Sequence, residues 1–221
     1  MNSHDDFAFE PIPGLPEHLP EGESILWQGK PGWIGIASRV LHTKLVAIYC
    51  AIMLGWFALN GIYVGHSGFE VLQSLGIPLI LVAALFAILV GVAYGLARST
   101  IYTITNRRLV LRFGIALPIT INLPFAKIET AALRKHSDGS GDITLAIRGK
   151  DHLAWLHLWP NVRPWHLRKP EPMLRSLPDA DDVAVLLADA MAKELPAGLA
   201  TPPQPKQPQG NPAGQAGLAT A

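Results

Sequence analysis

The chain has 221 residues, of which 49% are apolar and only 16% are charged, with 18 Lys and Arg against 17 Asp and Glu. This composition excludes a chain that is disordered throughout, a collagen-like repeat and a disulfide-stapled secreted domain, because the single cysteine, Cys50, cannot form an intrachain disulfide. The charges are unevenly spread, since Glu70 is the only charged residue between Leu45 and Ala97. We therefore interpret the chain as a membrane protein.

Residues 1–22 form an acidic, proline-rich leader that also contains apolar residues. These apolar residues include Phe7, Phe9 and Ile12. A purely solvated leader would not need them, so two interpretations stay open: a solvated leader, or one that docks in a groove of the folded domain or of a partner. The following segment, residues 23–44, approaches the membrane, and its residues 24–28 favour a first β-strand.

Two uncharged stretches, residues 45–64 and 75–97, are each long enough to cross a bilayer. They contain 20 and 23 residues, and a helix of 20 residues spans about 30 Å, the thickness of the hydrocarbon layer. The short connection between them, residues 65–74, requires an antiparallel hairpin. We therefore predict a transmembrane hairpin over residues 45–97.

The positive charges around this hairpin predict its orientation. The connection at residues 65–74 has no Lys or Arg, whereas Arg39 and Lys44 precede the first helix and several arginines, beginning with Arg98, follow the second. Since Lys and Arg accumulate on the cytoplasmic side, both termini are expected in the cytoplasm. The helices themselves contain no ionisable residue that would bind an ion, which argues against a transporter or channel.

Small residues recur at every fourth position in both helices. In the first helix they are Ala47, Ala51 and Gly55; in the second they are Ala83, Ala87, Gly91 and Gly95. Such stripes let helix backbones approach closely in lipid. Two interpretations stay open: the stripes face each other within the hairpin, or Gly91 to Gly95 forms a homodimer face, which would make the protein a homo-oligomer.

From Arg98 onward the apolar period changes from helical to alternating, which predicts β-strands. The strands are expected at residues 101–105, 108–113, 119–123, 127–135, 143–147 and 152–158. Pro178 and Asp179 then open a helix whose apolar stripe consists of Val183, Leu186, Leu187, Ala190 and Met191. The order predicts a pleckstrin-homology-like antiparallel barrel or sandwich with a C-terminal helix over residues 98–195, so that the whole chain is an α+β membrane protein.

The last segment of the chain, residues 196–221, has six Pro and four Gly among its 26 residues and no aromatic residue. This composition predicts a disordered tail.

Residues 157–178, which we call the strap, combine prolines with aromatic and basic residues. Five prolines favour an extended segment over a helix or a central strand. Aromatic and Arg side chains commonly anchor interfaces. The candidate partner-binding residues are Trp159, Arg163, Trp165, His166, Arg168 and Arg175. The alternative is that both tryptophans cover the barrel while the arginines contact lipid phosphates.

The barrel region is strongly basic, with 13 basic and 5 acidic residues between residues 98 and 175. Below a bilayer it would meet an anionic leaflet, which we expect as a second kind of partner. Nucleic-acid binding is not expected, because the domain is held at the membrane and has no recognition helix.

Neither a metal site nor catalysis is expected. The histidines His152, His157 and His166 lack a cysteine partner and a metal-ligand spacing. Residues 136–140 bring a histidine, two serines and an aspartate into one turn, but neighbours in sequence are not a catalytic triad and no catalytic motif is present. We therefore predict a non-enzymatic protein without a cofactor.

Two motifs resemble the bacterial pleckstrin-homology family of membrane proteins. They are residues 21–29 (EGESILWQG) and, after the hairpin, residues 102–109 (YTITNRRL) followed by Gly114. This resemblance covers residues 21 to about 148, and it implies the fold more than the function.

A second resemblance extends from about residue 4 to residue 194. Residues 7–16 (FAFEPIPGLP) and the strap (HLWPNVRPWHLRKPEPMLRSLP) are similar to the photosynthetic complex assembly proteins of purple bacteria. It implies an assembly factor for the reaction centre and its core light-harvesting complex, binding reaction-centre or core antenna subunits at the inner, intracytoplasmic photosynthetic membrane. The alternative is a general membrane-surface module that binds anionic lipid or a signalling partner.

Overall fold

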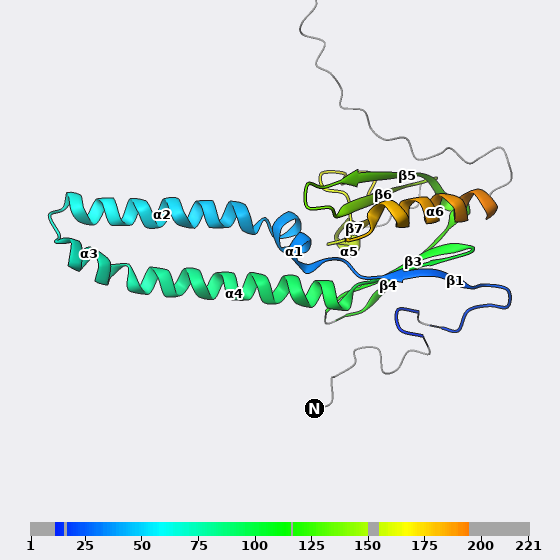
Figure 1. Ribbon diagram of the computed structural model, residues 1–221, viewed down its shortest axis with the longest axis horizontal. Helices are drawn as coiled ribbons and strands as arrows, with labels where there is room; N and C mark the ends of the chain where they lie inside the picture. The colour runs from blue at the N-terminus through cyan, green and yellow to red at the C-terminus, as the bar shows by residue number, and fades with distance from the viewer. Residues whose placement is uncertain (1–11, 16, 116, 150–154, 195–221) are drawn as a thin grey trace, which may run out of the picture.

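The computed structural model describes residues 12–15, 17–115, 117–149 and 155–194. Two long helices, α2 (Thr43–Tyr63) and α4 (Gly76–Ser99), run side by side and project from one end of a β-domain (Figure 1). Both are long and apolar enough to cross a membrane, and the most hydrophobic 18-residue window of each is not buried by the described part of the chain. The helices lie within a few residues of the two predicted stretches.

The connection between the long helices is partly helical rather than a simple loop. It contains α3 (Gly68–Ser74), whose first turn has reciprocal capping bonds. The Glu70 N–H donates to Ser67 Oγ at 3.3 Å, and the Ser67 N–H donates to Glu70 Oε2 at 2.7 Å. These bonds satisfy backbone N–H groups at the start of α3, in a connection where the sequence did not predict a helix.

A bent helical segment joins the β-domain to α2. It consists of α1 (Trp33–Gly35) and the π-helical turn η1 (Ile36–Val40), and it ends at His42. His42 has a left-handed conformation (φ 52°), which separates this segment from α2. Ile36 and Ala37 pack against Ala93, Leu96 and Ala97 near the end of α4, so the two ends of the hairpin are joined at the domain.

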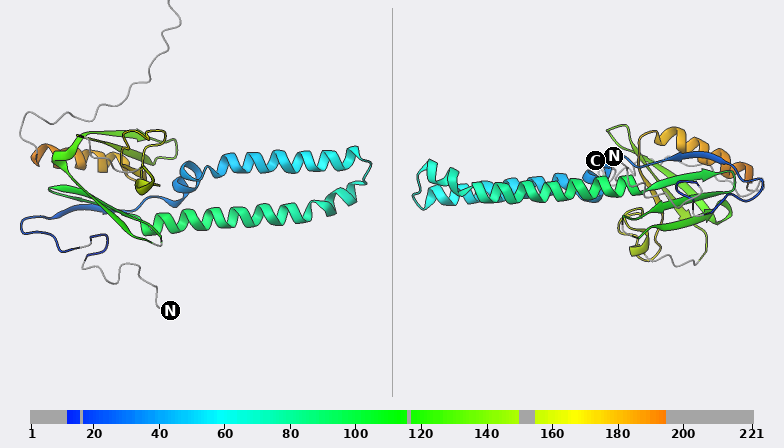
Figure 2. Two further views of the ribbon diagram at one scale, coloured as in Figure 1. Left: turned by 180° about the vertical axis from the view of Figure 1, so that it is seen from behind. Right: turned by 90° about the horizontal axis from the view of Figure 1, so that it is seen from below.

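The first sheet has four antiparallel strands in sequence order: β1 (Ile25–Gly29), β2 (Ile101–Thr105), β3 (Arg108–Phe113) and β4 (Ile119–Pro124). The predicted first strand is therefore confirmed, and the helical hairpin is inserted between β1 and β2. Figure 2 shows both ends of the hairpin meeting the domain at one end of this sheet.

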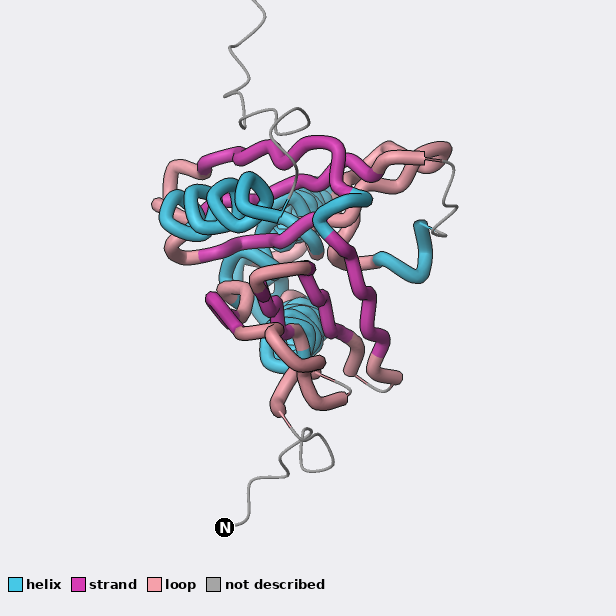
Figure 3. Tube along the Cα trace, turned by 90° about the vertical axis from the view of Figure 1, so that its right-hand side faces the viewer, coloured by secondary structure: helices cyan, strands magenta, loops and turns pink. Residues whose placement is uncertain are grey.

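The second sheet has three antiparallel strands in the order β5 (Ile128–Lys135), β6 (Gly141–Ile147) and β7 (Met173–Leu177). The turn η2 (Phe125–Lys127) links the two sheets, and α6 (Ala180–Glu194) packs on β5 and β6. Figure 3 shows the sheets and α6 in front of the hairpin, which is seen end-on.

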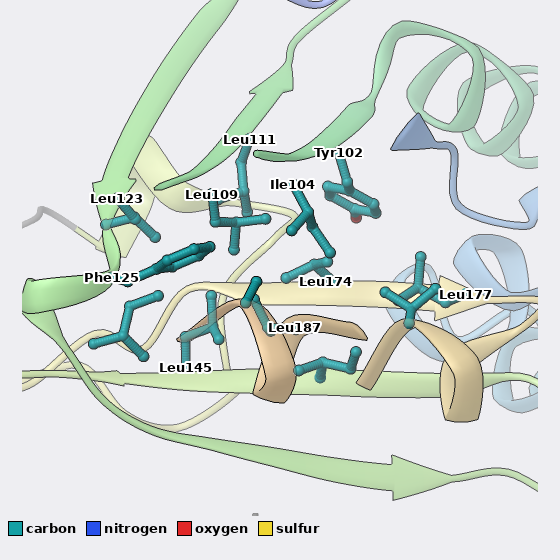
Figure 4. Packing of buried hydrophobic residues seen from close by; sticks show 14 of the residues in the cluster. Tyr102, Ile104, Leu109, Leu111, Leu123, Phe125, Leu145, Leu174, Leu177 and Leu187 are labelled. Atoms are coloured by element: carbon teal, nitrogen blue, oxygen red, sulfur yellow. The ribbon is translucent and has the colours of Figure 1, made fainter. Parts of the chain in front are cut away.

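The two sheets and α6 enclose one apolar core. Phe125, Leu109, Leu145 and Leu187 point toward one another from η2, β3, β6 and α6 (Figure 4). The fully enclosed members of this core also include Tyr102, Ile104, Leu111, Phe113, Ile128, Ile143, Leu174 and Leu177. All five residues of the stripe predicted for the C-terminal helix contact this core, which confirms that prediction.

One expectation about the strap region is wrong, and one strand in it was not predicted. Instead of a strand over residues 152–158, the structure has a short helix, α5 (Trp155–Leu158), and residues 150–154 lie outside the described part of the chain. Conversely, β7 was not predicted, although all five of its residues are buried. It lies at the edge of its sheet and follows Pro172, positions where proline does not interrupt a ladder.

The described part of the leader docks on the domain. Leu15 is only 2% exposed, and the Gln28 amide donates to the Pro13 carbonyl at 2.7 Å. Gly14 has φ +86°, and a Cβ at this position would lie 2.7 Å from Ile101, so glycine lets the turn approach β2. Of the two interpretations of the leader, docking on the chain's own domain is confirmed for residues 12–15. Phe7, Phe9 and the predicted tail, residues 196–221, lie outside the described residues.

Candidate interaction surface

The strap folds back on itself as a loop with a fixed base and an exposed tip. At its base, the Arg163 N–H donates to the Glu171 carbonyl at 2.9 Å, and the Met173 N–H donates to the Asn161 carbonyl at 2.9 Å. Val162 and Pro172 form an isolated antiparallel bridge between these two pairs. Residues 164–170 therefore form the tip, and the backbone hydrogen bonds of the base hold the two ends of the tip together.

A buried tyrosine connects the base of the strap to the first sheet. The hydroxyl of Tyr102, which is fully buried on β2, donates to Asn161 Oδ1 at 2.6 Å and accepts the Arg175 N–H at 3.1 Å. Burial raises the pKa of Tyr102 well above its ordinary value, so the phenol keeps the proton that it donates. An ion pair between Arg163 and Glu171 (2.7 Å) supports the same base from its outer side.

The tip presents a large apolar surface to solvent. Trp165 is 93% exposed and Leu167 is 66% exposed, while Arg168 is also exposed and His166 is half-buried. Trp165 has a left-handed backbone (φ 64°), an unusual conformation for a bulky residue. The interpretation that Trp165 covers the barrel is therefore wrong.

The structure places the remaining three candidate partner-binding residues in three different environments. Trp159, at 41% exposure, contributes to the surface of the strap. Arg163 is held in its ion pair with Glu171. Arg175 is wrong as a surface residue, because β7 directs it inward: it is 8% exposed and donates from Nη2 to the Val162 carbonyl at 2.7 Å. Burial lowers the pKa of Arg175, and the carboxylate of Asp142 opposes that effect.

A second polar cluster, the Arg39 clamp, joins the hairpin to the second sheet. The Arg39 guanidinium donates to Asp138 Oδ2 at 2.9 Å, to Ser140 Oγ at 2.7 Å and to Ser176 Oγ at 3.0 Å. Gly35 lies so close that a Cβ at this position would overlap Arg39 and Ser176. The clamp borders an open pocket of about 270 Å³ between η1, the β5–β6 turn and β7.

The Arg39 clamp explains the turn at residues 136–140, which the sequence showed only as a cluster of polar residues. Asp138 and Ser140 hold Arg39, while His136 Nε2 lies 2.9 Å from Asp142 Oδ2 on β6. A hydrogen bond from the Ser140 hydroxyl holds the pKa of Asp138 well below its ordinary value, and the hydrogen bond from Arg39 makes a smaller contribution in the same direction. The spacing of Arg39 from this turn, about one hundred residues in sequence, gave no signal that the two would meet.

Among the described residues, no group of three His, Cys, Asp or Glu side chains is placed to hold a metal ion. His152 lies outside the described residues, and His157 and His166 are not brought together with other potential ligands.

The small-residue stripes do not face each other within the hairpin, so that interpretation is wrong. Ala83, Ala87 and Gly91 are exposed, and a Cβ on Gly55 or Gly91 would meet nothing within 4 Å. The less exposed residues that recur along the two helices are others, most of them larger: Val46, Cys50, Leu54 and Ala58 on α2, and Val82, Phe86, Leu89 and Ala93 on α4. The predicted homodimer face at Gly91 to Gly95 stays a prediction. Gly95 contacts the chain itself at Ile115.

Some of the basic residues of the domain are paired with acidic residues of the same chain. Arg108 makes a two-pronged pair with Glu23 at 2.7 and 2.9 Å, and Lys135 lies 2.7 Å from Asp181. Arg112 is only 6% exposed. Part of the excess positive charge is therefore paired with acidic residues or buried.

Comparison with known proteins identifies one family and one extended relative. Residues 35–191 match the family model described as "Bacterial PH domain". The chain is 38% identical over 198 residues to a Rhodobacter capsulatus protein named "Uncharacterized 23.7 kDa protein in puhA 5'region", a similarity that covers 88% of this chain and 91% of that protein. No solved structure is a significant match to the chain.

Proposed function

The chain belongs to the bacterial PH domain family, and from this premise we propose that it is a non-enzymatic assembly factor for the photosynthetic reaction centre and its core light-harvesting complex. Two sequence relationships support this role. The Rhodobacter capsulatus relative is named for a position beside puhA, in a photosynthesis gene region. The leader and the strap also resemble photosynthetic complex assembly proteins.

In this proposal the two long helices lie in the inner membrane and both termini are cytoplasmic. The length and composition of α2 and α4 support the spans. The distribution of Lys and Arg, which flank the hairpin and are absent from residues 65–74, supports the orientation. The β-domain then lies directly beneath the cytoplasmic leaflet, where it can meet membrane subunits as they are inserted.

The observation that carries the proposal is the exposed tip of the strap. Trp165, at 93% exposure, is held on a base that is fixed by Tyr102 and by the Arg163–Glu171 pair. A large aromatic side chain on a preorganised loop loses little conformational entropy when it binds, and such residues dominate many interfaces. Reaction-centre or core antenna subunits are the proposed partners.

The test replaces Trp165 with alanine in the native host. Because Trp165 contacts little of its own chain, the variant should fold and accumulate normally, whereas losing an interface anchor typically costs about 2 kcal/mol or more. Near-infrared absorption of membranes should then show less reaction centre and core antenna at an equal amount of the protein on immunoblots.

Val185→Ala is the matched control, because Val185 is also an exposed apolar residue, at 62% exposure, but lies on α6. It should leave pigment–protein levels unchanged. Normal levels in the Trp165 variant, or an equal loss in both variants, would contradict a partner-binding role for the tip.

The alternative function, a general module for anionic lipid, has one observation in its favour: the net charge of residues 98–175. The intramolecular ion pairs of Arg108, Lys135 and Arg163 reduce the charge available for lipid. In this alternative, with the hairpin inserted in vesicles, changing the exposed Arg168 and Lys169 to glutamine would reduce the enrichment of anionic lipid around the protein, while the Trp165 variant would enrich it normally.

A further inference from the structure

The turn between β3 and β4 is unusually apolar for an exposed loop. No charged residue occurs between Phe113 and Ala126. Ile115 is 57% exposed and Leu117 is 79% exposed. Exposed turns of soluble domains are normally built from polar residues and glycine, because their side chains face water.

The position of this turn places it beside the end of a long apolar helix. The Ile115 side chain lies 3.2 Å from the position that a Cβ on Gly95 would occupy. Gly95 precedes Ser99, the last residue of α4, by about 6 Å along the axis, at 1.5 Å per residue. Figure 1 shows β3 and β4 converging beside the end of α4. The turn is therefore level with the last apolar turn of α4.

The backbone fixes the turn in this position. Gly114 has φ +117°, and a Cβ there would overlap the Leu117 carbonyl oxygen. The positive φ and this close approach therefore require glycine at position 114, directly before Ile115.

A second segment, distant in sequence, flanks the same part of α4. The turn η1 packs on Ala93, Leu96 and Ala97, and α1, which precedes it, exposes Trp33 (42%) and Ile34 (63%). Two separate segments thus present apolar side chains beside the same helical end. Tryptophan is enriched where protein crosses from the hydrocarbon layer to the headgroups.

We propose that the β3–β4 turn inserts into the cytoplasmic leaflet, with Ile115 and Leu117 among the acyl chains and Trp33 and Ile34 at the interface. The occupant of this surface is lipid, because the surface is continuous with the apolar sides of α4 and has no charge between residues 113 and 126. The inference rests on the proposed membrane location of α2 and α4. It adds a third contact with the bilayer, which would fix the tilt of the domain and hence the direction of the strap.

The test measures the depth of position 117 in single-copy lipid nanodiscs. Cys50→Ala gives a background without cysteine, and Leu117→Cys then carries an environment-sensitive fluorophore. Lipids with a nitroxide near the headgroup end of the acyl chain should quench this fluorophore several-fold more strongly than one at Val185→Cys, a residue on α6 with comparable exposure (62%).

A third labelled position separates failure of this inference from failure of the membrane assignment. Ile88, in the middle of α4, is 64% exposed, and a fluorophore at Ile88→Cys should be quenched by nitroxides near the end of the acyl chain. Quenching at position 88 without quenching at position 117 would overturn the inserted turn alone. No quenching at either position would overturn both. A blue-shifted but unquenched fluorophore at position 117 would mean that protein covers the turn, which also overturns the inference.

Discussion

The residues that matter most for the strap are buried polar ones rather than its exposed charges. Tyr102 joins Asn161 and the Arg175 backbone in one hydrogen-bonded group, and all three residues are nearly inaccessible to water. Buried polar groups are expensive when they lose a partner, because they then lose both water and the protein hydrogen bond. The strap is therefore positioned from within the domain.

Replacing Tyr102 with phenylalanine should loosen the base of the strap. The change leaves Asn161 Oδ1 and the Arg175 N–H without their partner, which should cost about 1–3 kcal/mol of stability. The expected results are a lower melting temperature of the purified protein and faster amide hydrogen exchange in the strap. Tyr94→Phe is the control, since Tyr94 is 52% exposed on α4. Equal stability of the two variants would show that the hydroxyl of Tyr102 does not hold the strap.

The sequence identified the strap but not the direction of each of its side chains. Trp159 and Trp165 are exposed, and the density of Trp and Pro was the signal that singled them out. Arg175 was grouped with them because it is charged, yet it lies on β7 with its side chain enclosed. Side-chain direction on β7 depends on its pairing with β6, a contact between segments distant in sequence. The five prolines of the strap led us to expect an extended segment there and no paired strand.

At the scale of elements, the Arg39 clamp transmits the position of the hairpin to the second sheet. Arg39 lies on η1 and its partners lie on the β5–β6 turn and on β7. The Gly32 N–H also donates to the Ser176 carbonyl at 2.8 Å. A separate route, through β1, joins the hairpin to the first sheet.

Asp138→Asn should remove the pH dependence that the Asp138 carboxylate gives to the stability of the fold. The ordinary pKa of the carboxyl is 3.8, and its folded value is lower because Ser140 and Arg39 stabilise the charged form. The carboxylate therefore stabilises the fold above about pH 4, and this contribution is lost as the pH falls through the folded pKa. The difference in melting temperature between the wild type and Asp138→Asn should be largest near neutral pH and shrink below pH 4. Asp189→Asn, on the exposed side of α6, is the control, and a difference that does not change with pH would contradict the clamp.

Local patterns predicted most elements, whereas long-range contacts decided the others. Alternation identified β2, β3, β4, β5 and β6, uncharged length identified α2 and α4, and helical period identified α6. Residues 155–158 have the same composition as a short buried strand, but only Leu158 is buried, and the segment is helical. The Arg39 clamp could not be predicted, since nothing local distinguishes an arginine that reaches a turn about one hundred residues away.

At the scale of the whole molecule, the insertion of the hairpin between β1 and β2 is the main constraint. Both ends of the hairpin return to one sheet, and Ile36 and Ala37 pack against the end of α4. The orientation of the hairpin in a membrane therefore determines on which side the β-domain lies. The tip of the strap and the Arg39 clamp lie on the same side of the membrane as the rest of the β-domain.

Orientation in the membrane is thus the prediction on which the cytoplasmic partners depend. A reporter enzyme that is active only in the periplasm should be active when fused at Ser67, within the connection that lacks Lys and Arg, and inactive when fused at Ala197. A reporter that fluoresces only in the cytoplasm should give the opposite pattern at the same two sites, which controls for unequal expression. Activity of the periplasmic reporter at Ala197 would place the β-domain outside the cytoplasm, and the strap would then meet a different set of subunit surfaces. Periplasmic activity at both sites would mean that the two helices do not form a hairpin across the membrane.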